Sequence, residues 1–573
     1  MASHSTAHYL IEGLIDTGIE YVFSNFGTDH VSIIEELARW KLDGRAHPKI
    51  MICPHEVVAV HMAGGYAAMT GRGQAVMVHV DSGTANAAMS LHNLFRARLP
   101  VFLMAGKAPY SSHGELPGSR DNYVHFIQDP FDIGSLVRPY VKWEYNLQSG
   151  VTTKEVLQRG NAVMQSDPKG PVYLTLPRET LAEEWDEAAI RKYPLERFGP
   201  VAAGGTDLPR ARAIAESLMA AKNPIAITSY IGRSSKAVIV LEELARTCGI
   251  VVTELNPSYM NFPHDSPCFA GFEPGVAVGG ADVGLLLDVD VPWLPKFVQD
   301  NPATRWLQVD VDAIKKDLPM WGFPAEVRVE GDCATVLTQV LDIIKAEATA
   351  DFKARVAVRM TAILAASEKR RQSLAELAAK PGKRNALSAH FVCAMLNKVI
   401  RPEDVVVNEA IRNTPAVVNQ IMRNKPDTLF GLAGAGLGFS GGFALGVKLA
   451  RPEARVIQII GDGGYHFTAP TAVYAVAQRY NLPILTVILD NGGWAAVKEA
   501  VLRVYPNGAA VETDDFQARL LGEQRRFEKV GEAFGAHGEY VTEPEQLEAA
   551  IMRCLAAMDK GQAAVLNVLV SPI

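Results

Sequence analysis

The feature that most constrains the fold is a regular alternation of strand-like and helix-like segments along all 573 residues. Apolar runs stop at polar or glycine-rich residues, as in QAVMVHV (74–80), VGLLLDV (283–289) and RVIQIIG (455–461). Amphipathic stretches with helical spacing lie between such runs. Because strands that alternate with helices are joined by crossover connections, this order predicts an α/β protein with doubly wound parallel sheets.

The alternation falls into three units, each of a size that is typical of a separate domain. We expect an N-terminal domain over residues 1–185, a central domain over 204–345 and a C-terminal domain over 386–573. The segments 186–203 and 346–385 are predicted linkers. The second of them is a charged helical stretch that ends at a Lys-Pro-Gly-Lys turn.

The composition excludes several classes of protein. Apolar residues make up 48%, charged residues 21%, and the net charge of −7 gives no basic surface for nucleic acid or an acidic membrane. No apolar run reaches the roughly 18 residues of a membrane span, and the N-terminus lacks the pattern of a signal peptide. The six cysteines are far apart, without a C-x-x-C pair, which favours a reducing cytoplasm. We therefore expect a cytoplasmic protein that acts on a small molecule.

Two strand ends in the C-terminal domain carry residues that suit a metal ion and a phosphate. Gly-Asp-Gly follows one apolar run at 461–463, and Asp-Asn-Gly-Gly follows the next at 490–493, with one predicted helix between them. Because the carboxyl ends of parallel strands meet at one sheet edge, Asp462 and Asn491 should lie close together. Their side-chain oxygens suit Mg²⁺ that carries a diphosphate, and the glycines allow close approach of the backbone. Each turn alone is equally typical of an ordinary loop, so the prediction depends on the pair.

The segment 461–494 resembles the "GDG…NN" signature of enzymes that use thiamine diphosphate. The order of the three units resembles the group of acetolactate synthase, pyruvate oxidase and benzoylformate decarboxylase over essentially the whole chain. The spacing from Asp462 to Asn491, 29 positions, is slightly longer than the usual one, and Asp490 stands where the first asparagine is expected. The resemblance implies pyrimidine-binding, central and diphosphate-binding domains in this order. It also implies that Asp462, Asn491 and the backbone carbonyl of Gly493 bind Mg²⁺.

A second anchor of the resemblance is IMICPHEVVAVHMAGGYAAMTGR (50–72), in which Glu56 opens a helix rich in small residues. By resemblance, Glu56 donates to the pyrimidine N1′ and thereby activates the thiazolium C2. The helix would pack on the same helix of a second subunit, which implies a homodimer or homotetramer with shared active sites. A glutamate in a first helical turn is also common for dipole reasons alone. A zinc motif does not fit, because His55 and His61 are six positions apart.

Further cofactor contacts follow from the same resemblance. Leu437 falls at the position of the bulky residue that supports the bent cofactor, next to Gly436. Arg412 and Asn413 lie in a strand-end loop that would meet the diphosphate. The remaining candidates flank the two metal-binding turns: Gly461, Gly463, Gly464, Tyr465, Gly493 and Trp494. Trp494 is equally compatible with a place in the core.

The substrate end is expected to be lined by the N-terminal domain. MVHVDSGTANAAM (77–89) resembles the loop that carries a catalytic histidine in benzoylformate decarboxylase, which makes His79 a candidate. A histidine that only satisfies a strand-end carbonyl is the alternative. Gln128 falls at the position of the active-site glutamine of the family. Asp29 and His30 are unusual polar residues in the loop that would face the substrate.

The implied reaction is cleavage or formation of a C–C bond by a lyase or carboligase that acts on a 2-oxo acid or related ketone, giving an aldehyde or an acyloin. Acetolactate synthase-like transfer and cleavage of a non-acid ketone or diketone stay open. FAD is not expected, because LLLDVDVPWLP (285–295) lacks the arginine-bearing stretch of the flavin-containing synthases. Outside the family, a nicotinamide oxidoreductase would need a G-x-G-x-x-G fingerprint. A non-catalytic cofactor-binding protein would have no need of Glu56.

Overall fold

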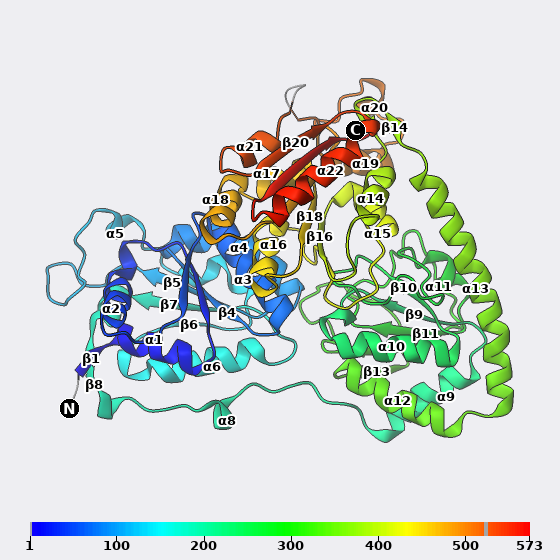
Figure 1. Ribbon diagram of the computed structural model, residues 1–573. Helices are drawn as coiled ribbons and strands as arrows, with labels where there is room; N and C mark the ends of the chain where they lie inside the picture. The colour runs from blue at the N-terminus through cyan, green and yellow to red at the C-terminus, as the bar shows by residue number, and fades with distance from the viewer. Residues whose placement is uncertain (1–2, 521–524, 573) are drawn as a thin grey trace.

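The computed structural model describes residues 3–520 and 525–572 and has three α/β domains, each built on a parallel sheet (Figure 1). The sheets lie within residues 21–177, 224–330 and 405–569. The prediction of an α/β protein with three doubly wound parallel sheets is thus confirmed. Among the described residues, no helix has both the length and the apolar character that a bilayer span requires.

The N-terminal domain has a six-stranded parallel sheet in the order β3-β2-β4-β5-β7-β6. Its strands are β2 (Tyr21–Ser24), β3 (Lys49–Ile52), β4 (Gln74–Val78), β5 (Val101–Lys107), β6 (Glu144–Asn146) and β7 (Val172–Pro177). Its helices are α1 (Thr6–Asp16), α2 (Val31–Leu42), α3 (Glu56–Thr70), α4 (Val80–Arg96), α5 (Val124–Ile127), α6 (Thr153–Gln165) and α7 (Arg178–Ala182). A short antiparallel pair, β1 (Ser3–Ser5) with β8 (Glu184–Asp186), joins the two ends of the domain.

The central domain has a five-stranded parallel sheet in the order β10-β9-β11-β12-β13. The strands are β9 (Pro224–Thr228), β10 (Val251–Glu254), β11 (Val283–Leu287), β12 (Arg305–Asp310) and β13 (Val327–Glu330). Helices α9 (Leu208–Ala220), α10 (Ser235–Cys248), α11 (Gly275–Gly280) and α12 (Cys333–Glu347) accompany this sheet, and α8 (Leu195–Phe198) lies in the preceding linker. The 29-residue helix α13 (Ala350–Ala378) then runs along the outside of the molecule toward the C-terminal domain (Figure 1).

The C-terminal domain has a six-stranded parallel sheet in the order β17-β16-β18-β19-β21-β20. The strands are β16 (Val405–Glu409), β17 (Leu429–Gly431), β18 (Val456–Gly461), β19 (Leu485–Asp490), β20 (His537–Val541) and β21 (Ala564–Leu569), preceded by the short pair β14 (Gly382–Lys383) and β15 (Ala386–Leu387). The helices are α14 (Ala389–Asn397), α15 (Thr414–Gln420), α16 (Phe439–Ala450), α17 (Asp462–Phe467), α18 (Pro470–Tyr480), α19 (Ala495–Val504), α20 (Ala509–Glu512), α21 (Glu528–Glu532) and α22 (Pro544–Asp559).

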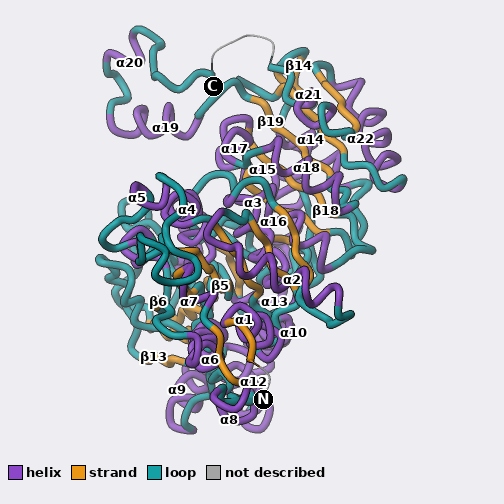
Figure 2. Tube along the Cα trace, turned by 90° about the vertical axis from the view of Figure 1, so that its left-hand side faces the viewer, coloured by secondary structure: helices purple, strands orange, loops and turns teal. Residues whose placement is uncertain are grey.

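Two features of this domain place the candidate site. The strand order reverses between β16 and β18, and such a switch point opens a crevice at the carboxyl ends of the strands. The segment with α19 and α20, which follows the second metal-binding turn, stands off from the body of the molecule (Figure 2).

The first and third domains share one hydrophobic core through helices α3 and α16, which lie side by side (Figure 1). An ideal Cβ on Gly65 would lie 2.1 Å from the carbonyl oxygen of Phe443, and one on Gly446 would lie 2.0 Å from that of Met62. Glycine therefore allows the two helix backbones to touch. The small residues of α3, which we expected to face a second subunit, thus pack on α16 of the same chain. The expectation of shared active sites stays a prediction.

Candidate active site

The structure brings the two predicted metal-binding turns together at one sheet edge. Asp462 follows β18 directly and Asn491 follows β19, and these two strands pair in parallel with α18 as the crossover helix. The Asp462 Oδ2 atom accepts a hydrogen bond of 2.8 Å from the backbone N–H of Gly492. Both Asp462 and Asn491 are buried. The predicted neighbourhood of the two turns therefore exists in the folded chain.

The glycines of these turns are needed either for a positive φ angle or for close packing against a neighbouring side chain. Gly492 and Gly493 have φ values of +89° and +155°, which residues with a side chain rarely adopt. Gly463 lies under the indole of Trp494, where an ideal Cβ would be 2.8 Å from the Trp494 Nε1 atom. The indole of Trp494 therefore covers the turn that runs from Gly461 to Gly464, and Trp494 does not pack in the core.

A residue outside the predicted set, Asp490, completes this corner. Burial, and then the nearby charge of Asp490, raise the pKa of Asp462 to about 7. The Oδ2 atom of Asp490 is buried and has no hydrogen-bond partner within the described part of the chain. Asp490 forms an ion pair with Arg525, and the neighbouring buried carboxyl group of Asp462 would favour a bound cation, since a buried charge is costly to leave unpaired. The donor set of carboxylate, amide and backbone oxygens therefore fits Mg²⁺.

A cavity of about 530 Å³ lies beside the second turn, at the carboxyl edge of the C-terminal sheet. Asn491 lines it together with the predicted diphosphate contacts Arg412 and Asn413. In this structure the guanidinium of Arg412 forms an ion pair with Glu499 of α19. Arg412 would have to exchange this partner in order to bind a phosphate.

The loop with Gly436 and Leu437 is held from both domains. The backbone N–H of Gly436 donates to the Asn93 Oδ1 atom of α4 at 3.1 Å, and its carbonyl accepts from Asn93 Nδ2 at 2.8 Å. Glu409, at the end of β16, accepts from the backbone N–H groups of Gly438 and Ser440. Burial raises the pKa of Glu409 to about 7. Leu437 is half-buried within this fixed loop.

Glu56 is buried at the first turn of α3 and is held by two side-chain amides. Asn25 Nδ2, from the loop after β2, donates to Glu56 Oε1 at 2.8 Å. Asn86 Nδ2, on α4, donates to Glu56 Oε2 at 3.2 Å. The two amides fix the orientation of the carboxyl group. Neither asparagine was singled out from the sequence, because their contact with Glu56 depends on the packing of β2 and α4.

His79 lies at the end of β4 between Asp29 and Gln128. Its Nδ1 atom is 2.6 Å from Asp29 Oδ1, and its Nε2 atom is 3.0 Å from Gln128 Oε1. Nδ1 donates to the Asp29 carboxylate when it carries the proton, and this contact favours the protonated form of the ring. The hydrogen bond to Asp29 correspondingly raises the pKa of His79. Burial alone would raise the pKa of Asp29, but hydrogen bonds from His30 and His79 hold it well below its usual range.

Glycines and a strained residue surround the hydrogen-bonded pair of Asp29 and His79, which we call the dyad. An ideal Cβ on Gly106 would lie 1.5 Å from Asp29 Oδ2, and one on Gly27 would lie 2.0 Å from His79 Nδ1. Val80 has a φ of +36°, which is strained for a β-branched residue, and its N–H donates to Asp29 Oδ2 at 3.3 Å. Strain of this kind is typical of functional sites.

Two predicted residues have surroundings that differ from our expectation. His30 is fully buried behind Asp29, with its Nδ1 atom 3.1 Å from Asp29 Oδ1, and does not face an open pocket. The side chain of Tyr465 packs in a core cluster with Tyr474 and Phe527. An aromatic residue after a short strand-end turn reaches back under the sheet, which the sequence alone does not reveal.

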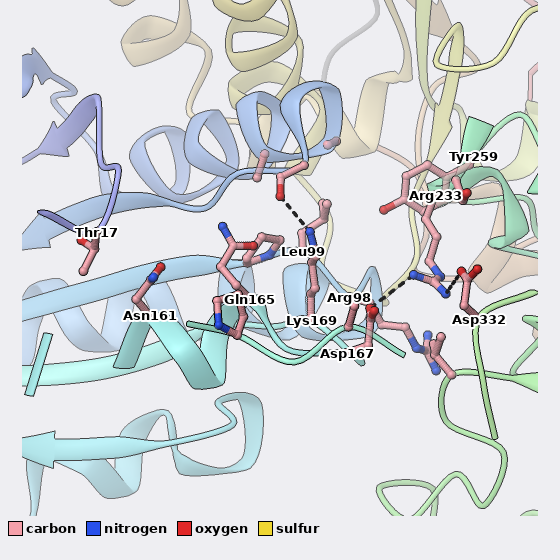
Figure 3. A pocket seen from close by; sticks show the side chains of 18 of the residues that line it. Thr17, Arg98, Leu99, Asn161, Gln165, Asp167, Lys169, Arg233, Tyr259 and Asp332 are labelled. Carbon is pink, nitrogen blue, oxygen red and sulfur yellow. Dashed lines mark hydrogen bonds and ion pairs between the residues drawn. The ribbon is translucent and has the colours of Figure 1, made fainter. Parts of the chain in front are cut away.

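A second cavity, of about 580 Å³, separates the N-terminal domain from the central domain (Figure 3). Leu99, just before β5, lines it, so this cavity lies at the amino ends of the strands and not at the edge that carries His79. Arg233 of the central domain has its Nη1 atom 3.3 Å from Asp167 of the N-terminal domain (Figure 3). This ion pair joins the two domains, whereas Arg233 Nε lies 3.2 Å from Asp288 of its own domain.

Comparison with known proteins agrees with this geometry. The N-terminal TPP-binding domain model of thiamine pyrophosphate enzymes matches residues 4–136, and the C-terminal TPP-binding domain model matches residues 413–568. The chain is 24% identical over 558 residues to benzoylformate decarboxylase from Pseudomonas aeruginosa, with 94% of each chain covered. It is 23% identical over 565 residues to acetolactate synthase isozyme 3 large subunit from Escherichia coli, with 96% of this chain and 92% of that protein covered.

A solved structure, the thiamine diphosphate-dependent 4-hydroxybenzoylformate decarboxylase from Rhodococcus jostii, shares the fold. It has a TM-score of 0.78 and 20% identity, and the match covers 100% of this chain and 99% of that one. Two matched domain models, whole-chain relatives and a shared fold lead to one conclusion: this chain belongs to the family of thiamine pyrophosphate-dependent enzymes, of the decarboxylase and acetolactate synthase type.

Proposed function

We propose that the protein is a Mg²⁺- and thiamine diphosphate-dependent lyase that decarboxylates a 2-oxo acid. The observation that carries the proposal is the chain of hydrogen bonds from Asp29 through His79 to Gln128, which holds the imidazole at the carboxyl edge of the N-terminal sheet and favours its protonated form. In its protonated form, His79 would attract the carboxylate of a 2-oxo acid and could transfer a proton from Nε2. Thiamine diphosphate supplies, when bound, a carbon nucleophile and an electron sink next to the scissile bond.

The residues of the chain divide the remaining tasks. Asp462, Asn491 and the carbonyl of Gly493 would hold Mg²⁺, with the diphosphate in the adjoining cavity near Asn413. Glu56, oriented by its two asparagine partners, would share a proton with the pyrimidine N1′. Leu437 would support the cofactor between its two ends.

The first experiment is binding of the cofactor, followed by a screen for substrates. Thiamine diphosphate with Mg²⁺ at about 100 times its dissociation constant should stabilise the fold by about 2.7 kcal/mol, and EDTA should abolish the effect. Release of CO₂ from a panel of aromatic and aliphatic 2-oxo acids then tests the reaction. A protein that shows no cofactor-dependent shift in melting temperature, or no CO₂ from any 2-oxo acid, would contradict the proposal.

Carboligation is a second candidate reaction, because acetolactate synthases are among the relatives that align along the whole chain. It is distinguished by product analysis: a carboligase forms an acyloin or acetohydroxy acid in the presence of a second carbonyl compound, whereas a simple decarboxylase releases the aldehyde.

A further inference from the structure

The metal-binding corner contains an ion pair that the chain supplies from a distant segment. Asp490, the last residue of β19, is 1% exposed, and its Oδ1 atom accepts from Arg525 Nε at 3.0 Å and lies 2.9 Å from Arg525 Nη2. The carbonyl of Arg525 accepts from Asn567 Nδ2 of β21 at 3.1 Å, which anchors the arginine backbone to the sheet. The guanidinium is therefore held beside the carboxyl ends of β19 and β21.

The same carboxylate touches the turn that would bind the cation. The N–H of Gly492 donates to Asp462 Oδ2 at 2.8 Å and to Asp490 Oδ1 at 3.1 Å, so the two carboxylates converge on one amide. The guanidinium lies over this turn, since an ideal Cβ on Gly492 would be 3.5 Å from Arg525 Nη2. Asp462 and Asp490 bring two negative charges to a place where the family signature has one aspartate and a neutral asparagine.

We propose that Arg525 is a positioning residue for the Mg²⁺ site, and that it acts through Asp490. The guanidinium cancels the charge of Asp490, so that the cation meets the net charge of one carboxylate, that of Asp462. The inference rests on the proposed function, because it concerns the same metal and diphosphate site.

A purely structural ion pair has a different consequence. It would tie the segment before α21 to the sheet, and its loss would lower stability without changing the affinity for the metal. The charge of the site and the stability of the segment must therefore be measured separately. The metal dissociation constant is the readout that a structural role alone would not move.

The test compares Asp490→Asn, Arg525→Met and the double variant with the unchanged protein. Isothermal titration with Mg²⁺ at saturating thiamine diphosphate gives the dissociation constant. Asp490→Asn leaves one excess positive charge and should weaken Mg²⁺ binding roughly tenfold, whereas Arg525→Met leaves one excess negative charge and should strengthen it roughly tenfold. The double variant restores the balance and should lie within about threefold of the unchanged protein.

A matched control is available one residue further along the chain. Arg526 forms its ion pair with Glu528 at 2.5 Å, so Arg526→Met removes the same charge without touching Asp490. Its Mg²⁺ dissociation constant should be unchanged.

Equal Mg²⁺ dissociation constants for all variants would overturn the proposal, as would a double variant that binds Mg²⁺ as weakly as Asp490→Asn. If Arg525→Met does not fold, the comparison of Asp490→Asn with the double variant decides. If the unchanged protein binds no thiamine diphosphate with Mg²⁺, the proposed function itself fails.

Discussion

At the scale of single residues, the candidate site depends on side chains that set the charge or the orientation of another. Asp29 raises the pKa of His79, Asn25 and Asn86 orient Glu56, and Asp490 adds to the effect of burial in raising the pKa of Asp462. In each case a candidate functional group has neighbouring side chains that set its pKa or its orientation. The adjusting partners are therefore the residues to vary.

Asp29→Asn should move the pH dependence of catalysis. Because Asp29 raises the pKa of His79, the protonated ring persists above pH 6.5, which is about the ordinary pKa of histidine. We therefore expect kcat/KM for a 2-oxo acid to fall only as the pH rises through the raised pKa. In Asp29→Asn the falling limb should shift to lower pH. Profiles of kcat/KM against pH measure the shift. Asp81→Asn, which removes a weaker influence on His79, is the control and should leave the limb nearly in place. Coincident profiles for Asp29→Asn and the unchanged enzyme would refute the role of the dyad.

Glu56→Gln should abolish activation of the cofactor but keep its binding. The amide is nearly isosteric but cannot exchange a proton with N1′, so hydrogen–deuterium exchange at the thiazolium C2 should slow by at least about a hundredfold. The increase in melting temperature with thiamine diphosphate and Mg²⁺ should persist. Exchange at the normal rate would remove Glu56 from its proposed role.

At the scale of elements, the contact between α3 and α16 joins the first domain to the third. Glycine makes this contact possible, because the backbone atoms of one helix occupy the space that a side chain on the other would need. The contact also fixes where α3 begins, and hence the position of Glu56, relative to the loop that holds Leu437.

Gly65→Ala should therefore destabilise the protein. Its Cβ would meet the carbonyl oxygen of Phe443, which belongs to a helix backbone and cannot rotate away, and the overpacking should cost about 1–3 kcal/mol. Urea unfolding measures the change in free energy. Gly279→Ala in α11 is the matched control, because an ideal Cβ there meets nothing within 4 Å. Equal stability of the two variants would show that α3 and α16 separate readily.

At the scale of the whole molecule, the candidate catalytic and metal-binding residues form two groups on different domains. Glu56, His79 and Gln128 belong to the N-terminal domain, and Asp462 and Asn491 belong to the C-terminal domain. The resemblance to the family implies that each complete site combines one group from one subunit with the other group from its partner. This arrangement can be tested without a structure of the assembly.

Mixing two inactive variants should restore activity if the sites are shared. In a hybrid of Glu56→Gln with Asp462→Asn, one site carries both defects and the other carries none. Random pairing should thus recover about a quarter of full activity, since half of the dimers are hybrids with one intact site. Co-expression with two affinity tags allows the hybrid to be purified, and the purified hybrid should have about half of full activity, because each dimer has one intact site of two. No recovery in a confirmed hybrid would place both groups of each site in one chain.

The sequence pattern by itself determined the α/β class and the positions of Asp462 and Asn491 at two strand ends, whereas Glu56 and the order of the domains were implied by the family resemblance. These features are local, because hydrophobic periodicity and glycine-rich strand ends are written in consecutive residues. The sequence did not reveal that the side chain of Tyr465 packs in the core, or that α3 packs on α16 of the same chain.

Only the tertiary structure decided which side chains adjust the catalytic ones. Asn25 lies 31 residues from Glu56, Asp29 lies 50 residues from His79, and Arg525 lies 35 residues from Asp490. No local pattern encodes such pairs, because the contact exists only after separate strands have paired and their ends have met at one edge. The chemistry of the site was thus readable from short motifs, whereas its electrostatic balance arose from the packing of distant segments.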